Sequence, residues 1–298
     1  MDDRAESVDD DLAGTEAASV AAFPIGRRAV VASGLISGFT LATARVEAQA
    51  IHTDAKGIVA GETRIPSGRD KLPAYYARPQ GRGPFPVVLV IEEIFGVHEY
   101  IKDVCRRLAH AGYAAVAPEL YARIADLSKM TDVKTIIRDV ILKAPDAQML
   151  ADLDAAARWS ADVNHGDLGR LAVTGFCRGG RDTWLYAAHN PRLRAAVAWY
   201  GPIGGPKSAI QPRTAADIAT KLNCPLLGLY GGQDTSINIA DVQAAAQHAR
   251  RAGRIVEIVV YPDAPHGFHA DYRPSYRAAD ARDGWDRMLG WFRRYGVA

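Results

Sequence analysis

Short apolar runs alternate with longer helical segments from Gly57 to the end of the chain. The run at residues 86–91 is continuously apolar, which is typical of a strand that is buried on both faces of a parallel sheet. Residues 145–161 and 178–189 carry apolar side chains at the three- and four-residue spacing of helices that cover a sheet. The alternation therefore predicts an α/β fold with a mostly parallel sheet and helices on both faces.

The remaining elements follow from the same patterns. Residues 61–66 and 72–78 are expected to form an opening antiparallel pair. Residues 124–144 show no clear period, and we interpret them as a surface helix, with a cap over a binding site as the alternative. Further strands are predicted at residues 114–117, 171–174, 195–199, 225–230 and 255–261, and further helices at residues 100–111, 239–252 and 276–295.

The composition is that of a folded globular protein, with 48% hydrophobic and 23% charged residues among 298. The formal net charge is only +2 and Lys and Arg are scattered, so we expect a small-molecule enzyme and no nucleic-acid partner. Cys105, Cys177 and Cys224 show neither a CxxC spacing nor histidines at metal-ligand intervals, so we expect no metal and no other cofactor. Cys105 and Cys224 are predicted to be buried; the sequence leaves their pairing and the oligomeric state open.

The first 50 residues differ from the rest of the chain. Residues 1–26 are rich in Asp, Ala and Ser without a period, and we predict that they are disordered. Arg27-Arg28 then precede an uncharged run at residues 29–44 that is diluted by Gly and Ser. Ala48-Gln49-Ala50 supplies the small-x-small pattern that a signal peptidase requires. This order resembles a twin-arginine export signal.

The signal departs from the usual pattern at two places, because Gly26 precedes the arginines and Val30-Val31 follow them. We predict export to the periplasm, with a mature chain that begins near Ile51. The alternatives are a membrane-tethering helix or a disordered extension, and the protein is cytoplasmic if the segment is not a working signal. Residues 29–44 are too short and too weakly apolar for a stable membrane span, so none is expected in the mature form.

The turn Gly175-Phe176-Cys177-Arg178-Gly179-Gly180 follows a predicted strand and opens a predicted helix. It matches the small-x-nucleophile-x-small pattern of a nucleophile elbow. Such a turn holds the nucleophile in strained backbone geometry, and the residues two before and two after it must be small. The helix N-terminus also favours the thiolate form of a cysteine. The pattern predicts Cys177 as a nucleophile; the alternative is a tight turn with a buried cysteine.

A nucleophile of this kind needs a base and an orienting acid, which this arrangement takes from later strands. Asp234 follows the strand predicted at residues 225–230, and His266 follows the last predicted strand. We predict Asp234 as the acid and His266 as the base. Asp263 and His269 are the competitors, but Asp263 lies only three residues from His266, and His269 lies beyond the Pro-His-Gly corner.

Residues 57–297 resemble the dienelactone hydrolase family, also called carboxymethylenebutenolidases. The resemblance is carried by Glu93-Ile94-Phe95-Gly96, Gly112-Tyr113-Ala114, Pro118-Glu119-Leu120-Tyr121-Ala122-Arg123, the elbow at Cys177, the loop at Asp234, and His266-Gly267-Phe268. It implies a single α/β-hydrolase domain over residues 51–298. It also implies that Glu93 contacts the resting thiol and assists its conversion to thiolate. The oxyanion hole is expected from the backbone N–H groups of Ile94 and Arg178.

The resemblance further implies that arginines bind a substrate carboxylate. Arg123 falls on one of these positions, close to Tyr121, which we also expect to contact substrate. The second position holds Ala270, and Arg273 is near enough to substitute by a different route. Dienelactone itself therefore stays an open question as the substrate.

These residues together predict a hydrolase of small-molecule esters or lactones that works through an acyl-thioenzyme intermediate. A peptidase or thioesterase on the same scaffold is the first alternative, because a triad sets acyl transfer but the pocket selects the acyl group. An exported binding protein with a vestigial pocket is the second, and the complete set of Cys177, Asp234, His266 and Glu93 argues against it.

Overall fold

An eight-stranded sheet forms the centre of the computed structural model, which describes residues 51–298. Its strand order is β1-β2-β4-β3-β5-β6-β7-β8. β1 pairs with β2 and β2 with β4 in antiparallel fashion, and all other neighbours are parallel. The predicted mostly parallel sheet and the opening antiparallel pair are thus confirmed. The expected disordered N-terminus and export signal lie outside the described residues.

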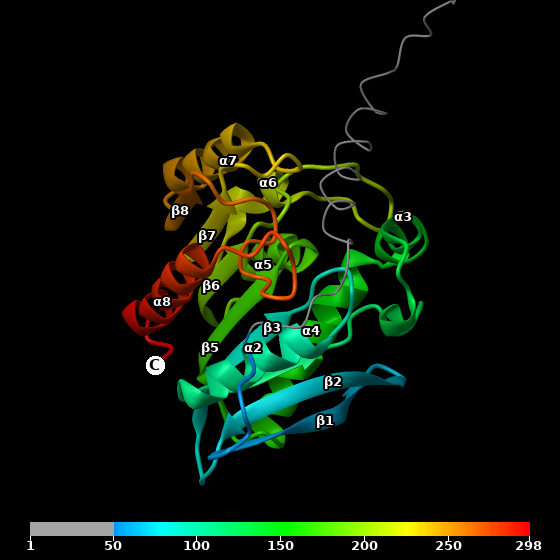
Figure 1. Ribbon diagram of the computed structural model, residues 1–298, viewed down its shortest axis with the longest axis vertical. Coiled ribbons are helices and arrows are strands. Elements are labelled where there is room, and N and C mark those ends of the chain that lie inside the picture. The colour runs from blue at the N-terminus through cyan, green and yellow to red at the C-terminus, as the bar shows by residue number, and fades with distance from the viewer. Residues whose placement is uncertain (1–50) are drawn as a thin grey trace, which may run out of the picture.

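Helices cover both faces of this sheet, with α4 and α5 on one face and α2 and α8 on the other (Figure 1). The strands are β1 (Ile58–Ser67), β2 (Asp70–Pro79), β3 (Phe85–Ile91), β4 (Ala114–Pro118), β5 (Gly166–Phe176), β6 (Leu193–Trp199), β7 (Leu226–Gly231) and β8 (Val256–Tyr261). The helices are α2 (Glu99–His110), α3 (Val133–Thr135), α4 (Asp146–Asp162), α5 (Arg178–His189), α6 (Ala215–Ile218), α7 (Ile239–Arg251) and α8 (Ala278–Arg294), with single turns at η1 (Leu127–Lys129), η2 (Ile136–Val140), η3 (Ile141–Lys143) and η4 (Ala219–Lys221).

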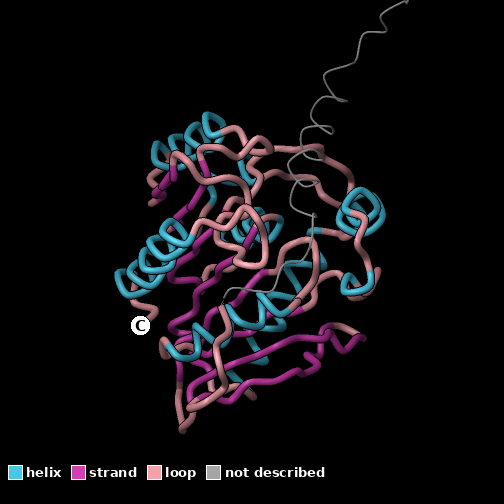
Figure 2. The backbone as a smooth tube through the Cα atoms, in the orientation of Figure 1, coloured by secondary structure: helices cyan, strands magenta, loops and turns pink. Residues whose placement is uncertain are grey.

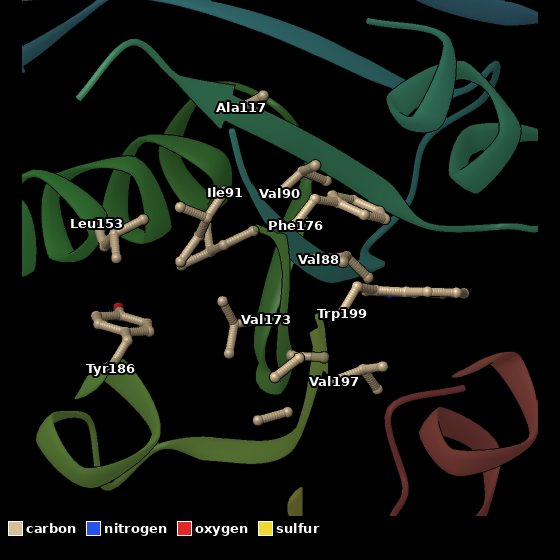
Figure 3. Packing of buried hydrophobic residues seen from close by; sticks show 14 of the residues in the cluster. Val88, Val90, Ile91, Ala117, Leu153, Val173, Phe176, Tyr186, Val197 and Trp199 are labelled. Carbon is tan, nitrogen blue, oxygen red and sulfur yellow. The ribbon is translucent and has the colours of Figure 1, made fainter. Parts of the chain in front are cut away.

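The core lies where the central parallel strands meet these helices. Val88 and Val90 of β3 lie with Val197 of β6 on one face of the sheet, whereas Val173 of β5 points to the other face, and all four side chains are fully buried (Figure 3). Each fully buried aliphatic side chain contributes about 1.5–3 kcal/mol relative to an exposed one. The continuous apolar runs of the sequence therefore become the central strands because both of their faces are withdrawn from water.

Two stretches differ from what the sequence predicts. β5 begins at Gly166, five residues earlier than predicted, because Phe85 and Pro86 of β3 pair with its polar start. Residues 124–144 form no continuous helix and instead fold into η1, α3, η2 and η3. Ile136 and Val140 anchor these turns in the core, so the interpretation as one surface helix is wrong.

Long loops follow the carboxyl ends of β7 and β8 and lie near the start of α5 (Figures 1 and 2). The longer one, residues 262–277, connects β8 to α8 and is called the β8–α8 loop below. Because the carboxyl ends of parallel strands meet at one edge of a sheet, this edge gathers the side chains that the sequence singled out. Within residues 51–298, no helix is long and apolar enough to cross a membrane.

Candidate active site

Cys177 occupies a strained turn between β5 and α5. Its backbone has φ 55° and ψ −116°, a conformation that residues with a side chain rarely adopt. A Cβ atom on Gly175 would lie 2.2 Å from the carbonyl oxygen of Gly179, and one on Gly179 would lie 2.5 Å from the carbonyl oxygen of Glu92. The turn can therefore form only with glycine at both positions, as the elbow pattern requires.

Backbone hydrogen bonds hold this turn to the sheet. The N–H of Cys177 donates to the carbonyl of Trp199 at 3.0 Å, and the N–H of Gly180 donates to the carbonyl of Cys177 at 2.9 Å. The side chain of Cys177 is 1% exposed, at the N-terminus of α5. Cys177 is thus the N-cap residue of α5.

Asp234 and His266 form a direct pair across the loops that follow β7 and β8. Nδ1 of His266 lies 2.7 Å from Oδ2 of Asp234. The backbone N–H and the hydroxyl of Ser236 donate to Oδ1 of Asp234 at 2.8 and 2.6 Å. Burial raises the pKa of Asp234, but His266 and Ser236 outweigh this effect and lower it. Asp234 is therefore an ionised carboxylate that fixes the orientation of the imidazole ring.

The electrostatic surroundings of His266 connect it to the nucleophile. Burial lowers the pKa of His266, but the charges of Asp234 and Cys177 and hydrogen bonds to both residues raise it to about 10. The ring of Tyr200 packs edge-on against His266, with the ring centroids 5.2 Å apart. The structure thus brings Cys177, His266 and Asp234 together, and their catalytic roles stay a prediction.

The two competing residues are placed elsewhere. Asp263 is exposed at the start of the β8–α8 loop. Nδ1 of His269 lies 2.6 Å from the hydroxyl of Tyr100, and its ring stacks between Phe176 and Trp285. Burial keeps the pKa of His269 well below its usual range, so this ring is neutral and part of the core.

Glu93 is fully buried and engaged through both carboxylate oxygens. The hydroxyl of Tyr272 donates to Oε2 at 2.5 Å, Nη2 of Arg273 donates to Oε1 at 3.0 Å, and Nε2 of His98 lies 3.6 Å from Oε2. Burial raises the pKa of Glu93, but these three neighbours outweigh it and lower the pKa to about 2. Within residues 51–298, its hydrogen-bond donors are thus Tyr272 and Arg273, and the contact with the Cys177 thiol that the resemblance implies is not among its hydrogen bonds.

Arg273 lies beside the nucleophile but faces Glu93. Its side chain is fully buried, and its guanidinium lies 5.1 Å from the ring centroids of Phe95 and Tyr272. Burial lowers the pKa of Arg273, and Glu93 and then, more weakly, Cys177 raise it above its usual range. Its Nη1 has no hydrogen-bond partner among the described residues, so a substrate carboxylate could bind Arg273 there beside the bond to Glu93.

Arg123 and Tyr121 are also bound to carboxylates of the protein. Arg123 donates to Asp152 at 2.6 and 3.0 Å and to Asp70 at 2.6 Å, which joins the β1–β2 turn to α4. The hydroxyl of Tyr121 lies 3.4 Å from Oδ2 of Asp182. Substrate contacts by either residue stay a prediction, and for Arg123 they compete with two ion pairs.

The residues expected to form the oxyanion hole lie in the turn after β3 and at the start of α5. Ile94 is 2% exposed in a tight turn that is closed by a bridge between Glu93 and Gly96. Arg178 is the first residue of α5, and its Nε lies 3.5 Å from Oδ1 of Asp182. The short turn and the helix start fix the backbone of both residues.

Three residues of the site were missed by the sequence reasoning, namely Tyr200, Ser236 and Tyr272. Tyr200 directly follows β6 and has φ 38°, so its place at the carboxyl end of a strand could have identified it. Ser236 follows Asp234 by two residues, the spacing of a local side-chain to backbone turn. Tyr272 lies in an irregular loop and gave no signal. Within residues 51–298, no group of three or more His, Cys, Asp or Glu side chains is placed to hold a metal ion.

Comparison with known proteins identifies the family of this chain. The model of the dienelactone hydrolase family matches residues 72–296. The chain belongs to the dienelactone hydrolase family. Within this family, a protein of Methylorubrum extorquens described as a candidate carboxymethylenebutenolidase is 54% identical over 275 residues, which cover 92% of this chain and 94% of the relative.

Further members of the family have a similar sequence identity to this chain. A protein of Escherichia coli strain K12 with the same description is 57% identical over 261 residues, which cover 87% of this chain and 96% of the relative. A crystal structure from Klebsiella pneumoniae described as a candidate dienelactone hydrolase superposes with a TM-score of 0.78 at 56% identity, covering 80% of this chain and 99% of that one. This dienelactone hydrolase family member thus has the α/β-hydrolase fold that its sequence predicts.

Proposed function

We propose that the protein hydrolyses ester or lactone bonds of small molecules, with Cys177 as the nucleophile, His266 as the base and Asp234 as the orienting acid. The observation that carries this proposal is the position of His266, which bonds to Asp234 through Nδ1 and whose pKa is raised by both Asp234 and Cys177. An imidazolium held between a carboxylate and a sulfur favours a thiolate in the resting site. The names of the relatives, carboxymethylenebutenolidase and dienelactone hydrolase, agree with a lactone substrate.

The reaction proceeds in two halves. The Cys177 thiolate attacks the carbonyl carbon, and the backbone N–H groups of Ile94 and Arg178 stabilise the developing oxyanion. The carbon–oxygen bond of the ester then breaks, and the His266 imidazolium donates its proton to the leaving alkoxide. In the second half, His266 takes a proton from water, the hydroxide attacks the thioester, and the acid and the thiolate are released.

As an alternative to the imidazolium–thiolate resting pair, the resting site holds a neutral Cys177 thiol beside a neutral His266, and Glu93 then receives the thiol proton. With Arg273 and Tyr272 bound, its pKa of about 2 makes it a poor base. If a substrate anion draws Arg273 away, burial of Glu93 raises its proton affinity, because burial disfavours the charged form. Activation would then depend on the arrival of an anionic substrate.

Trapping of the acyl-enzyme tests the nucleophile. Purified protein is incubated with a panel of activated esters, and the increase in mass of the intact chain is located by peptide mapping. We expect the acyl group on Cys177 and no turnover in Cys177→Ala. Cys224→Ala serves as the matched control, since Cys224 is also a buried, unpaired thiol and lies away from the elbow. Retention of most esterase activity by Cys177→Ala would refute the mechanism.

We also propose that the protein is exported and that cleavage after Ala50 releases the mature chain. The order of Arg27-Arg28, the diluted apolar run and Ala48-Gln49-Ala50 supports this proposal. N-terminal sequencing of active protein from a bacterial periplasm tests it. We expect Ile51 as the first residue, and an intact Met1 end on active material contradicts export.

A further inference from the structure

The start of the described chain is bound to the β8–α8 loop. The backbone N of Ile51 donates to Oδ2 of Asp271 at 2.7 Å, across 220 positions of sequence. Two residues later, the N–H of Thr53 donates to Asp103 at 2.7 Å, and Arg106 donates to the carbonyl of Thr53 at 2.8 Å. Residues 51–53 therefore follow helix α2, which carries Asp103 and Arg106, and reach Asp271.

The Asp271 carboxylate could bind a cation, because the single hydrogen bond from the Ile51 amide does not use all of its acceptor positions. It is 5% exposed, and its Oδ1 accepts no hydrogen bond from the described residues. The charged or titratable groups that act on it are Arg107, which stabilises the carboxylate, Asp103, which opposes it, and Tyr276. Burial raises the pKa of Asp271 in spite of the bond from Ile51. In the uncleaved chain, the surrounding groups thus balance the negative charge of the Asp271 carboxylate only in part.

The position of Asp271 connects this contact to the site. The β8–α8 loop carries His266 near its start, and the two residues that directly follow Asp271 are the hydrogen-bond donors to Glu93. A stronger bond at Asp271 would hold Tyr272 and Arg273 in place.

We propose that cleavage between Ala50 and Ile51 creates an α-ammonium group that binds Asp271 as an ion pair and fastens the β8–α8 loop. This inference rests on the proposed export and cleavage. The peptidase adds water across the amide bond: the carbonyl of Ala50 becomes a carboxylate on the released leader, and the nitrogen of Ile51 becomes –NH3⁺. The mature chain then gains an interaction that the precursor lacks.

The gain follows from the chemistry of the two nitrogen groups. An amide offers Asp271 one neutral N–H, whereas an ammonium offers three N–H groups and a full positive charge. Because the acceptor is already an ionised carboxylate, the gain comes from the added positive charge and from the two further N–H donors, for which Oδ1 of Asp271 is an acceptor without a partner among the described residues. An α-amino group has a pKa of about 8, so it is charged at neutral pH.

The test compares one protein before and after cleavage. A factor Xa recognition sequence replaces residues 47–50 of the full chain, so that cutting leaves Ile51 as the first residue. We expect cutting to raise Tm by about 2–6 °C. We also expect hydrogen exchange in residues 267–277 to slow by about fivefold. An unchanged Tm and exchange rate would overturn the proposal.

Two variants separate the ion pair from simple removal of the leader. In the first, one Gly stays before Ile51 after cutting, which displaces the ammonium by about 3.8 Å and leaves Asp271 intact. In the second, Asp271→Asn removes the negative charge. Both should lose the rise in Tm, and an equal rise in the Gly-extended chain would overturn the proposal even if Asp271→Asn does not fold. N-terminal sequencing of exported protein tests the natural cleavage site separately, and the Cys177→Ala assay tests the hydrolase separately.

Discussion

Nη2 of Arg273 donates to Oε1 of Glu93 at 3.0 Å, and both side chains are fully buried. The pKa of the neighbouring Glu92 is shifted in the opposite direction to that of Glu93, because burial and the nearby Glu119 raise it well above the usual range. Two consecutive glutamates thus differ in protonation because only one of them faces a guanidinium. The charge of Arg273 makes the largest single contribution to keeping Glu93 ionised, and removal of either partner breaks a buried ion pair.

Glu93→Gln should lower stability as well as catalysis. Breaking a buried ion pair by neutralising one partner costs about 3–5 kcal/mol, because the remaining charge stays buried. The double variant Glu93→Gln with Arg273→Gln should recover much of the stability in urea denaturation. If Glu93 receives the thiol proton, the double variant should still show slow alkylation of Cys177 in the presence of a substrate analogue. Alkylation at the wild-type rate would make the pair structural.

Substitutions of the three central residues should have unequal effects. Cys177→Ala should abolish turnover, and His266→Ala should cost nearly as much, with kcat/KM falling on the order of 10³-fold or more, because the residues act as a unit. Asp234→Asn should be severe but milder, since the ring of Tyr200 still packs against His266. Steady-state assays with one activated ester measure all three. A His266→Ala variant with nearly full activity would exclude His266 as the base.

Arg123→Ala should reduce stability more than it changes selectivity. Asp152 is fully buried, so loss of Arg123 leaves its carboxylate without its ion pair, at a cost of about 1–3 kcal/mol for this partly exposed arginine. Arg82→Ala, at an exposed arginine, is the control and should stay within about 0.5 kcal/mol in urea denaturation. Matched neutral and anionic esters should lose activity equally. A selective loss on the anionic ester would instead show that Arg123 binds a substrate carboxylate.

The sequence predicts the sheet and the elbow well because both depend on local patterns. The buried runs of β3 and β7 have no polar residue, and the elbow depends on glycines whose Cβ atoms would collide with backbone. Asp234 and His266 could be placed because each follows a strand that ends at the same edge of the sheet.

The ion-pair partners of the predicted residues could not be predicted from local sequence patterns. Arg123 meets Asp152 of α4, and Glu93 meets Arg273, which lies 180 positions away. Neither pair shares a periodic segment, so no local pattern connects them. The β8–α8 loop is irregular, and the fold of the sheet and the helices packed on it determines where its side chains lie.

The titration of His266 should depend on both of its neighbours. Its pKa of about 10 lies above the usual value near 6.5 because Asp234 and Cys177 stabilise the imidazolium. A pKa that is raised on folding contributes stability that is fully present below pH 6.5 and is lost as pH rises through about 10. Asp234→Asn and, by a smaller amount, Cys177→Ala should each lower the midpoint, which NMR of ring-labelled histidine measures. His269, held neutral by burial, is the internal control and should not titrate near neutral pH. A midpoint for His266 near 6.5 in the wild-type protein would contradict an imidazolium–thiolate resting state.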